Sequence, residues 1–253
     1  MPSSTNPKLN HLLASLPASV WSRWLPQLEA VTLPLGRVLC EPREVQSHVY
    51  FPTTAIVSLL YITKNGASAE TAVVGNEGMV GISLFMGGES TTGRAVVQSA
   101  GRAYRLKAAA IKDEFSFPTV LHLLLRYTLA LITQTAQTAV CNRHHSLDQR
   151  LCRWLLLSLD RVDDNELFMT QERIADRLGV RREGVTASAR KLQRSGLIRY
   201  ARGHIEVLDR IGIERRSCEC YAVVKKEYDR LLLATRCDDA PARVQAIRRL
   251  GIA

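Results

Sequence analysis

The sequence lacks the long apolar run that a membrane-spanning helix requires. Its two most apolar stretches, 121–131 and 155–159, are interrupted or bounded by polar side chains, namely those of His122, Arg126, Arg153 and Asp160. Neither stretch offers the roughly 20 apolar residues that cross a bilayer. We therefore expect no transmembrane helix.

A secretory segment and a disulfide framework are also missing. No positively charged, apolar segment opens the sequence, and a chain of 253 residues is too large to need disulfide staples. Its six cysteines are scattered: Cys40, Cys141, Cys152, Cys218, Cys220 and Cys237. We expect a cytoplasmic protein with mostly reduced thiols.

Signatures of catalysis are absent as well. No nucleophile-base pair, zinc signature or phosphate loop stands at a usable spacing, so we do not expect an enzyme. Acidic side chains are outnumbered, because 34 Lys and Arg face 24 Asp and Glu and give a net charge of +10. This excess favours an anionic partner, which on charge alone is either nucleic acid or a membrane surface.

The chain is long enough for two modest domains. Helical patterns over 7–13 and 18–28 precede a stretch, 31–106, in which short β-rich runs alternate with turn residues, among them Gly75, Gly78, Gly81, Gly87, Gly88 and Gly93. Such regular punctuation predicts a small β-barrel or jelly roll. A short helix is expected over 108–115.

A long helix is predicted over 119–145, and it would extend roughly 40 Å. Its apolar face becomes small and polar beyond about Ala130, which permits close helix approach and suits a self-complementary two-fold contact. The alternative is an ordinary helix packed on its own barrel. A second helix is expected over 147–162, and we place a domain boundary near Ser146.

Two short helices with a glycine turn follow over 170–194. Thr170 is the expected N-cap, and the first helix buries one apolar face (Ile174, Ala175, Leu178) before Gly179 supplies the turn. The second helix buries Val185, Ala189 and Leu192 and points its charged residues outward. This arrangement is typical of a helix-turn-helix.

The outward face of the second helix divides by role, because a helix N-terminus approaches base edges in the major groove. We expect the base-reading residues to be Arg181, Arg182, Glu183 and Thr186. The residues expected at phosphates are Thr170, Gln171, Arg190, Lys191, Arg194 and Arg202. Arg202 would lie at the tip of a wing formed by two short strands within 197–208.

A helical hairpin whose charges simply face water is the alternative interpretation of this segment. Between Arg181 and Arg216, however, ten Lys or Arg stand against four Asp or Glu. A winged helix-turn-helix is favoured because all the local signals agree: the N-cap, the glycine turn, the buried face, the outward arginines and the wing.

The stretch Gly179-Val180-Arg181-Arg182-Glu183-Gly184-Val185, ending in 192–198, strongly resembles the Crp/Fnr (cyclic-AMP receptor protein) family. The resemblance covers roughly 30–208 and implies an α+β fold. It implies a cyclic-nucleotide-binding-like β jelly roll as sensory domain over 1–118, a dimerisation helix over 119–146 and a winged helix-turn-helix over 147–216, followed by a helical tail over 217–253. The resemblance also implies that Arg182 and Glu183 read bases. The family's further arginine, one turn on, is replaced by Ala187.

The sensory domain departs further from the family. Val74–Gly81 resembles its glycine-rich turn only loosely, with Glu77 as the candidate carboxylate, and the position of the phosphate-binding arginine falls near Thr91. Without that cation the phosphate loses its charge-assisted hydrogen bonds. We expect no cyclic nucleotide, and an unidentified effector, if there is one, would contact Glu77, Gly78, Arg94 and Thr128.

Metal cofactors are not expected either. The N-terminal cysteine group that holds an iron-sulfur cluster in some relatives is absent, because Cys40 stands alone. Cys218-Glu219-Cys220 and His144-His145 could ligate a metal, but two isolated pairs lack a four-ligand spacing, so we interpret them as reduced or surface residues.

These observations predict a transcription regulator with double-stranded DNA as its partner, and with no membrane partner. It would bind a partly palindromic site as a homodimer and contact RNA polymerase or block it. The alternative is a ligand-binding signalling module whose winged helix mediates protein contacts. The amphipathic stretch 221–233 in the tail has no partner that the sequence identifies.

Overall fold

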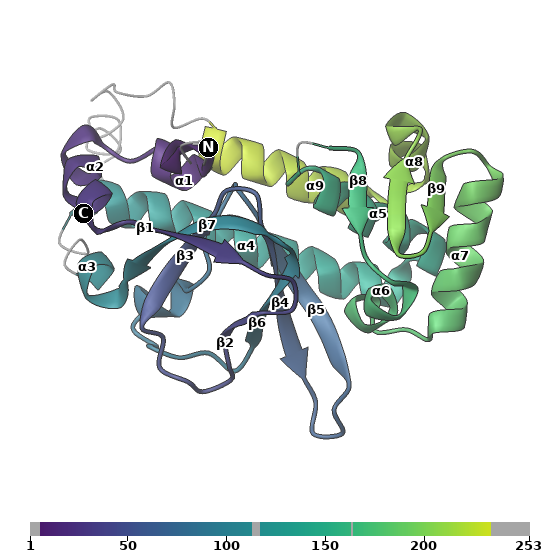
Figure 1. Ribbon diagram of the computed structural model, residues 1–253, viewed down its shortest axis with the longest axis horizontal. Helices are drawn as coiled ribbons and strands as arrows, with labels where there is room; N and C mark the ends of the chain where they lie inside the picture. The colour runs from purple at the N-terminus through teal and green to yellow at the C-terminus, as the bar shows by residue number, and fades with distance from the viewer. Residues whose placement is uncertain (1–5, 113–116, 163, 234–253) are drawn as a thin grey trace, which may run out of the picture.

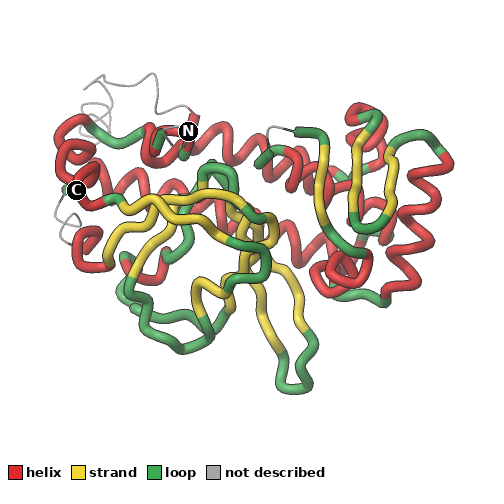
Figure 2. Tube along the Cα trace, in the orientation of Figure 1, coloured by secondary structure: helices red, strands yellow, loops and turns green. Residues whose placement is uncertain are grey.

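The computed structural model describes residues 6–112, 117–162 and 164–233. A long helix, α4, runs along most of the molecule, with a β-roll packed on one part and a small helical unit with its own sheet at the other end (Figure 1). Figure 2 shows that the strands gather in these two separate places, with helices between them. In the part of the chain that the structure describes, none of the helices combines the length and apolarity needed to cross a membrane.

The N-terminal helices cover one end of the β-roll. They comprise the 3-10 helix η1 (Pro7–Leu9), α1 (His11–Ala14), α2 (Ala18–Trp24) and η2 (Leu25–Gln27). Trp24 of α2 is buried and its ring lies 6.0 Å from that of Phe51. These helices therefore pack against the β-roll.

Seven antiparallel strands form the β-roll as two sheets. One has the order β1-β7-β3 and the other β2-β6-β4-β5. Their bounds are β1 (Glu29–Leu33), β2 (Val38–Cys40), β3 (His48–Pro52), β4 (Ile56–Ile62), β5 (Ser68–Val74), β6 (Arg94–Ser99) and β7 (Gly101–Lys107), with a 3-10 turn η3 (Ile82–Leu84). Consecutive residues are buried along parts of β4, β5 and β6, and the two antiparallel sheets confirm the predicted jelly roll.

Helix α4 (Pro118–His144) follows the short α3 (Ala108–Lys112), and both agree with the expected helices as far as the described residues extend. Pro118 opens α4, where its missing N–H costs nothing. The expected apolar face is divided in two. Leu124, Thr128 and Leu131 are buried in the chain's own core, whereas Leu125 and its neighbours on the adjacent face are exposed.

The chain changes direction at Ser146, between α4 and α5 (Leu147–Leu159). Ser146 caps α5 through a reciprocal capping box with Gln149. The cap fixes the start of α5. Ser146 directly follows His145, which is the C-cap of α4. The hinge between the two halves of the chain is therefore defined by local sequence.

The second unit is a winged helix. It comprises β8 (Glu166–Phe168), α6 (Gln171–Leu178), α7 (Arg182–Arg194), β9 (Ile198–Ala201) and β10 (His204–Val207), with the sheet order β8-β10-β9. Strand β8 was not expected from the sequence. Its three residues are too few to show an alternating pattern, and only the pairing with β10 makes them a strand.

After the wing, α8 (Arg210–Arg216), α9 (Glu219–Tyr228) and a π-helical turn η5 (Asp229–Leu233) return along the molecule. Helix α9 lies beside α4 (Figure 1) and buries Tyr221, Val224 and Tyr228. The partner of the amphipathic stretch is thus the chain's own long helix. The rest of the expected tail, 234–253, lies outside the described residues.

A buried ion pair joins the β-roll to the turn that follows α5. Arg161 donates from Nε to Glu77 Oε1 at 2.9 Å, and its Nη2 lies 2.8 Å from the same oxygen. The Glu77 carboxylate also accepts from the backbone N–H of Gly75. Arg161 leaves no room for a side chain at Gly75, where a Cβ would lie 2.6 Å from its Cγ. This packing holds the two halves of the chain together.

A second buried network lies among β4, β5, β6 and α5. Ser58 Oγ lies 2.5 Å from Glu70 Oε2 and 2.7 Å from Gln98 Oε1, and Gln98 Nε2 donates to Ser158 Oγ at 3.2 Å. The Ser58 hydroxyl has one proton and can donate to only one of these two oxygens. A protonated Glu70 would donate the second hydrogen bond to Ser58 Oγ. Burial raises the pKa of Glu70 to about 7, although the hydrogen bond to Ser58 opposes the shift.

We predict that Glu77→Gln lowers the free energy of unfolding by about 3 to 5 kcal/mol, because it leaves the Arg161 charge buried without a counterion. Urea denaturation followed by circular dichroism measures the change. Glu29→Gln is the control, because its ion pair with Arg105 is solvent-exposed and should add little. Equal small effects of both substitutions would show that the Glu77 pair does not hold the halves together.

We also predict a pH dependence that originates in Glu70. The folded state keeps this carboxyl protonated up to about pH 7, whereas the unfolded chain releases the proton near pH 4.3. The Glu70 contribution to stability is therefore fully present at low pH and is lost as the pH rises through about 7. The difference in urea midpoint between wild type and Glu70→Gln should change across this window. A difference independent of pH would contradict the assignment.

Candidate nucleic-acid interface

Helix α6 begins and ends where its sequence dictates. Thr170 is the N-cap, and its Oγ1 accepts from the backbone N–H of Arg173 at 3.3 Å. Gly179 ends the helix with φ +63°, a conformation that favours glycine. Ile174, Ala175 and Leu178 are buried as predicted. The glycine turn then directs the chain into α7.

Helix α7 packs its inner face on α5 and leaves its N-terminus open. Val185, Ala189 and Leu192 are buried, and a Cβ at Gly184 would lie 2.8 Å from Leu147 Cδ2, so this glycine permits close helix approach. The N-cap, Arg181, makes no side-chain cap. The first backbone N–H groups of α7 are therefore available to an anion.

The predicted wing is present. Strands β9 and β10 pair Ala201 with His204 across a two-residue turn, and both turn residues have positive φ, +50° at Arg202 and +81° at Gly203. This backbone conformation matches the twist of a tight hairpin. Tyr200 donates from its hydroxyl to the backbone oxygen of Met169 at 2.7 Å and thereby ties the wing to the start of α6.

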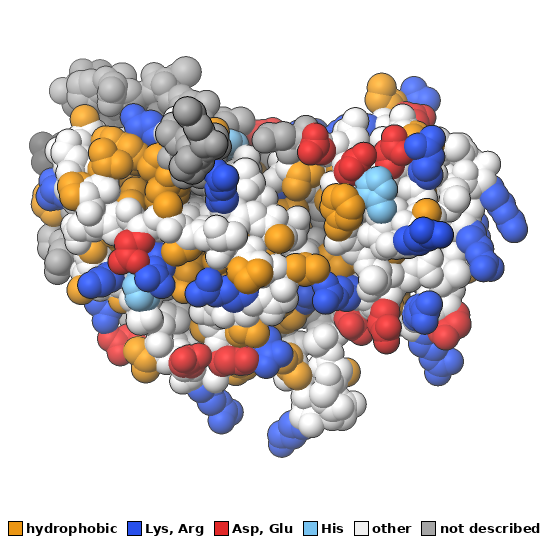
Figure 3. All heavy atoms as spheres, viewed as in Figure 1, with side chains coloured by type: hydrophobic (Ala, Val, Ile, Leu, Met, Phe, Trp, Pro, Cys, Tyr) orange, Lys and Arg blue, Asp and Glu red, His pale blue; other side chains and the backbone are white. Residues whose placement is uncertain are grey.

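Several of the predicted residues border one hollow between the wing, α6 and α7. Its volume is about 450 Å³, and it is lined by Thr170, Gln171, Glu172, Arg182, Tyr200, Arg202 and Gly203. Figure 3 shows Lys and Arg side chains projecting from the end of the molecule that carries α7. The chain therefore presents a basic, concave surface at the N-terminus of an exposed helix.

The basic side chains on this surface differ in availability. Five of them form no ion pair with any residue that the structure describes: Arg181, Arg182, Arg190, Arg194 and Arg202. Lys191 instead lies 3.0 Å from Asp148 on α5. The hydrogen bond from Ser188, together with Lys191, lowers the pKa of Asp148, so this partner is firmly anionic.

Two further predicted contact residues bond to each other. Thr186 Oγ1 lies 2.5 Å from Gln171 Oε1 and 3.0 Å from the backbone oxygen of Arg182. The structure thus brings Gln171 and Thr186 together across the motif. Tyr200 is a residue of the hollow that sequence reasoning missed, because a tyrosine in a short strand carries no signal of its own.

The four residues expected at an effector are not brought together. Glu77 is engaged with Arg161, Gly78 packs under the ring of Tyr127, and the Thr128 hydroxyl donates to the backbone of α4. Only Arg94 lines the large cavity of the β-roll, and Glu41 holds it in a two-point ion pair at 2.7 and 2.8 Å. The expected set was grouped by sequence position, whereas β-strand geometry separates it.

That cavity measures about 560 Å³ and lies between the β-roll and α4. Apolar side chains such as Leu59, Leu60 and Met86 form most of its wall, and α4 contributes Leu131, Ile132, Thr135 and Ala136. Thr91, at the expected position of the phosphate-binding arginine, also lines it. The cavity could take a small molecule, and it offers only one cation, which is already paired.

The cysteine and histidine pairs are not isolated and their cysteines are not at the surface, whereas the expected reduced thiols agree with the structure. Cys141, His145, Cys218 and Cys220 have their ligand atoms within 4.8 Å of one another, and the three cysteines are buried. His145 and the cysteine pair meet because α9 returns along α4, and its start carries Cys218 and Cys220. Sequence spacing across more than 70 residues gave no signal of this contact.

Comparison with known proteins agrees with the geometry. Residues 149–216 match the family model of the Crp-like helix-turn-helix domain. This range includes α6, α7 and the wing, which border the hollow. No curated protein matches the chain.

Solved structures share the fold. A protein of Eubacterium rectale assigned to the Crp/Fnr family of transcriptional regulators has a TM-score of 0.65 at 18% identity, over 83% of this chain and 98% of that chain. FixK2 from Bradyrhizobium japonicum has a TM-score of 0.63 at 14% identity, over 76% of this chain and 98% of that chain. TTHA1359 of Thermus thermophilus is described as a transcriptional regulator of the same family. It has a TM-score of 0.61 at 22% identity, over 75% of this chain and 98% of that chain. The predicted order of jelly roll, long helix and winged helix is thereby confirmed.

Proposed function

We propose that this chain is a DNA-binding transcription regulator of the Crp/Fnr type that binds a partly palindromic promoter site as a homodimer. Its residues 149–216 match the Crp-like helix-turn-helix model, and its fold is shared with a regulator assigned to that family. In this proposal residues 1–118 are the sensory domain, 119–146 the dimerisation helix, 147–216 the DNA-binding domain and 217–253 a helical tail. RNA polymerase is the proposed protein partner, since a promoter-bound regulator acts by contacting or blocking it.

The single observation that supports base reading is the exposed, unpaired N-terminus of α7. Arg182 and Glu183 stand in its first turn and are exposed. Arginine donates two hydrogen bonds to guanine, and glutamate accepts one from cytosine, in the major groove. Arg190 and Arg194 lie farther along the helix and suit phosphates, whereas Lys191 must first leave Asp148.

The exposed face of α4 supports a homodimer. Leu125, Leu129, Ile132, Ala136 and Ala139 are all exposed and are spaced alternately by four and three residues. This is the spacing of the a and d positions of a coiled coil, which pack against the same positions of a second helix. We define these five residues as the seam. A second copy would cover it and would place two α7 helices on one DNA site.

The cavity supports an apolar effector. A cyclic phosphate needs a free cation, and the guanidinium of Arg94 is already held by Glu41. An uncharged ligand in the cavity would touch α4 at Ile132 and Ala136, which are also seam residues. Such a ligand could thus shift the packing of the dimer.

A ligand-binding module whose winged helix contacts only protein remains the alternative function of this chain. DNA binding by the purified protein tests this alternative.

We predict that Arg182→Ala weakens binding to the specific site by about 1 to 3 kcal/mol and relaxes base preference. Arg190→Ala should weaken binding to all sequences alike and reduce its salt dependence. Footprinting and fluorescence anisotropy measure both, with Arg37→Ala, on an exposed loop of the β-roll, as the control. Wild-type behaviour of both interface variants would refute the assignment.

We also predict that Leu129→Glu converts the dimer to a monomer, because it places like charges opposite each other in the seam. Sedimentation velocity measures the mass. Val45→Glu is the matched control, since Val45 is an exposed apolar residue of the β-roll away from α4. A monomeric wild type, or a dimer unaffected by the seam charge, would rule out the seam as the interface.

A further inference from the structure

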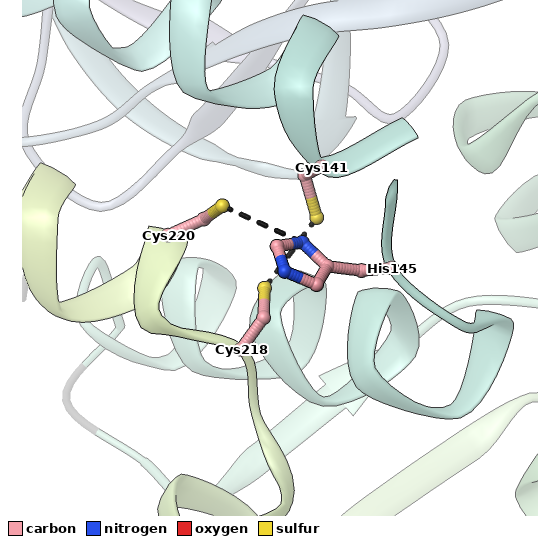
Figure 4. Close-up of side chains that lie close together, drawn as sticks. All are labelled: Cys141, His145, Cys218 and Cys220. Carbon is pink, nitrogen blue, oxygen red and sulfur yellow. Dashed lines mark hydrogen bonds between the residues drawn. The ribbon is translucent and has the colours of Figure 1, made fainter. Parts of the chain in front are cut away.

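We propose that Cys141, His145, Cys218 and Cys220 bind one zinc ion, which fastens α9 to the end of α4. Figure 4 shows the four side chains converging from two places in the chain. Cys141 lies in the last turns of α4 and His145 directly follows that helix, whereas Cys218 and Cys220 flank the start of α9.

Two of the ligand-atom distances match a tetrahedral mononuclear site, and all four ligand atoms lie within 4.8 Å of one another. Cys141 Sγ lies 3.5 Å from Cys218 Sγ, and Cys220 Sγ lies 3.6 Å from His145 Nδ1. Zinc bonds of about 2.3 Å to sulfur and about 2.0 Å to nitrogen place tetrahedral ligand atoms roughly 3.5 to 3.8 Å apart. An iron-sulfur cluster interposes several iron and sulfide ions and needs wider spacing. The geometry therefore favours a single ion.

The surroundings of His145 are those of a zinc ligand. Its Nδ1 faces the cysteines, and its Nε2 lies 3.3 Å from Glu219 Oε1. A zinc-bound imidazole commonly donates its other N–H to a carboxylate, which fixes the ring orientation and its tautomer. Glu219 stands between the two cysteine ligands in sequence, so the same turn supplies both.

Burial and charge agree with a closed, structural site. Cys141 is 0% exposed, Cys218 4% and Cys220 1%, so water has no open coordination position. Three thiolates and one zinc ion carry a net charge of −1. The buried guanidinium of Arg153 interacts electrostatically with Cys141 and Cys220 and balances this charge. Binding displaces the three thiol protons and needs no oxidant.

The position of the site gives it a mechanical role. Cys141 and His145 precede the Ser146 hinge, and the other two ligands follow the winged helix. The ion would therefore join the chain just before and just after the DNA-binding unit, and would restrict its movement relative to α4. This consequence for DNA affinity rests on the proposed function, whereas metal binding itself does not.

The test begins with the reduced, full-length protein. Mass spectrometry of metals should find about one zinc per chain, and replacement by Co²⁺ should give the intense visible bands of tetrahedral cobalt with a sulfur-to-cobalt charge-transfer absorption. Cys218→Ser and Cys220→Ser should lose the metal. Cys40→Ser should keep it, since Cys40 is a buried cysteine outside the cluster. Glu219→Gln should weaken zinc affinity by about 10- to 100-fold in competition with a chelator.

Reduced wild type that binds neither zinc nor Co²⁺ would overturn the proposal, as would equal metal content in wild type and Cys220→Ser. A Cys141–Cys218 disulfide that persists under reducing conditions and prevents metal binding would overturn it too and would indicate a redox pair. If a cysteine variant does not fold, the zinc content of the wild type and the spectrum of its cobalt form still test whether the site binds a metal. Zinc-loaded protein that binds no DNA would refute the proposed function and leave the metal site intact.

Discussion

Packing around α4 is the constraint on which the rest of the molecule depends. One face of this helix buries Leu124, Tyr127 and Leu131 against the β-roll, and a neighbouring face receives α9. A third face carries the exposed seam. Because close packing leaves little freedom in a core, a shift at any one face must be felt at the others. The cavity, the proposed dimer contact and the proposed zinc site all adjoin this one helix.

The winged helix is joined to the β-roll by a buried ion pair. Arg161, in the turn after α5, pairs with Glu77 of the β-roll. Breaking such buried pairs costs far more than breaking surface pairs, because a desolvated charge is left behind. The proposed zinc ion would add a further attachment at the hinge. The orientation of α7 is thus set by polar contacts at the junction as well as by its own small core.

The elements of the winged helix-turn-helix were predictable because their signals are local. Thr170 and Gly179 bound α6, the apolar positions of α7 repeat at helical spacing, and Arg202-Gly203 forms the expected turn. The effector residues were not predictable in the same way. A glycine-rich turn identifies a loop, but whether Glu77 faces a cavity or an ion-pair partner depends on Arg161, a residue 84 positions away. The partner of Lys191 depends likewise on α5.

The sequence by itself therefore determined the order of jelly roll, long helix and winged helix, since caps, turns and hydrophobic periodicity act over a few residues. Tertiary structure alone decided which charges are paired and which ligands meet. Arg94 is held by Glu41 across 53 positions, and Cys141 meets Cys218 across 77. Ion pairs and metal sites depend on distance through space, and the chain path that closes those distances is set by the packing of whole elements.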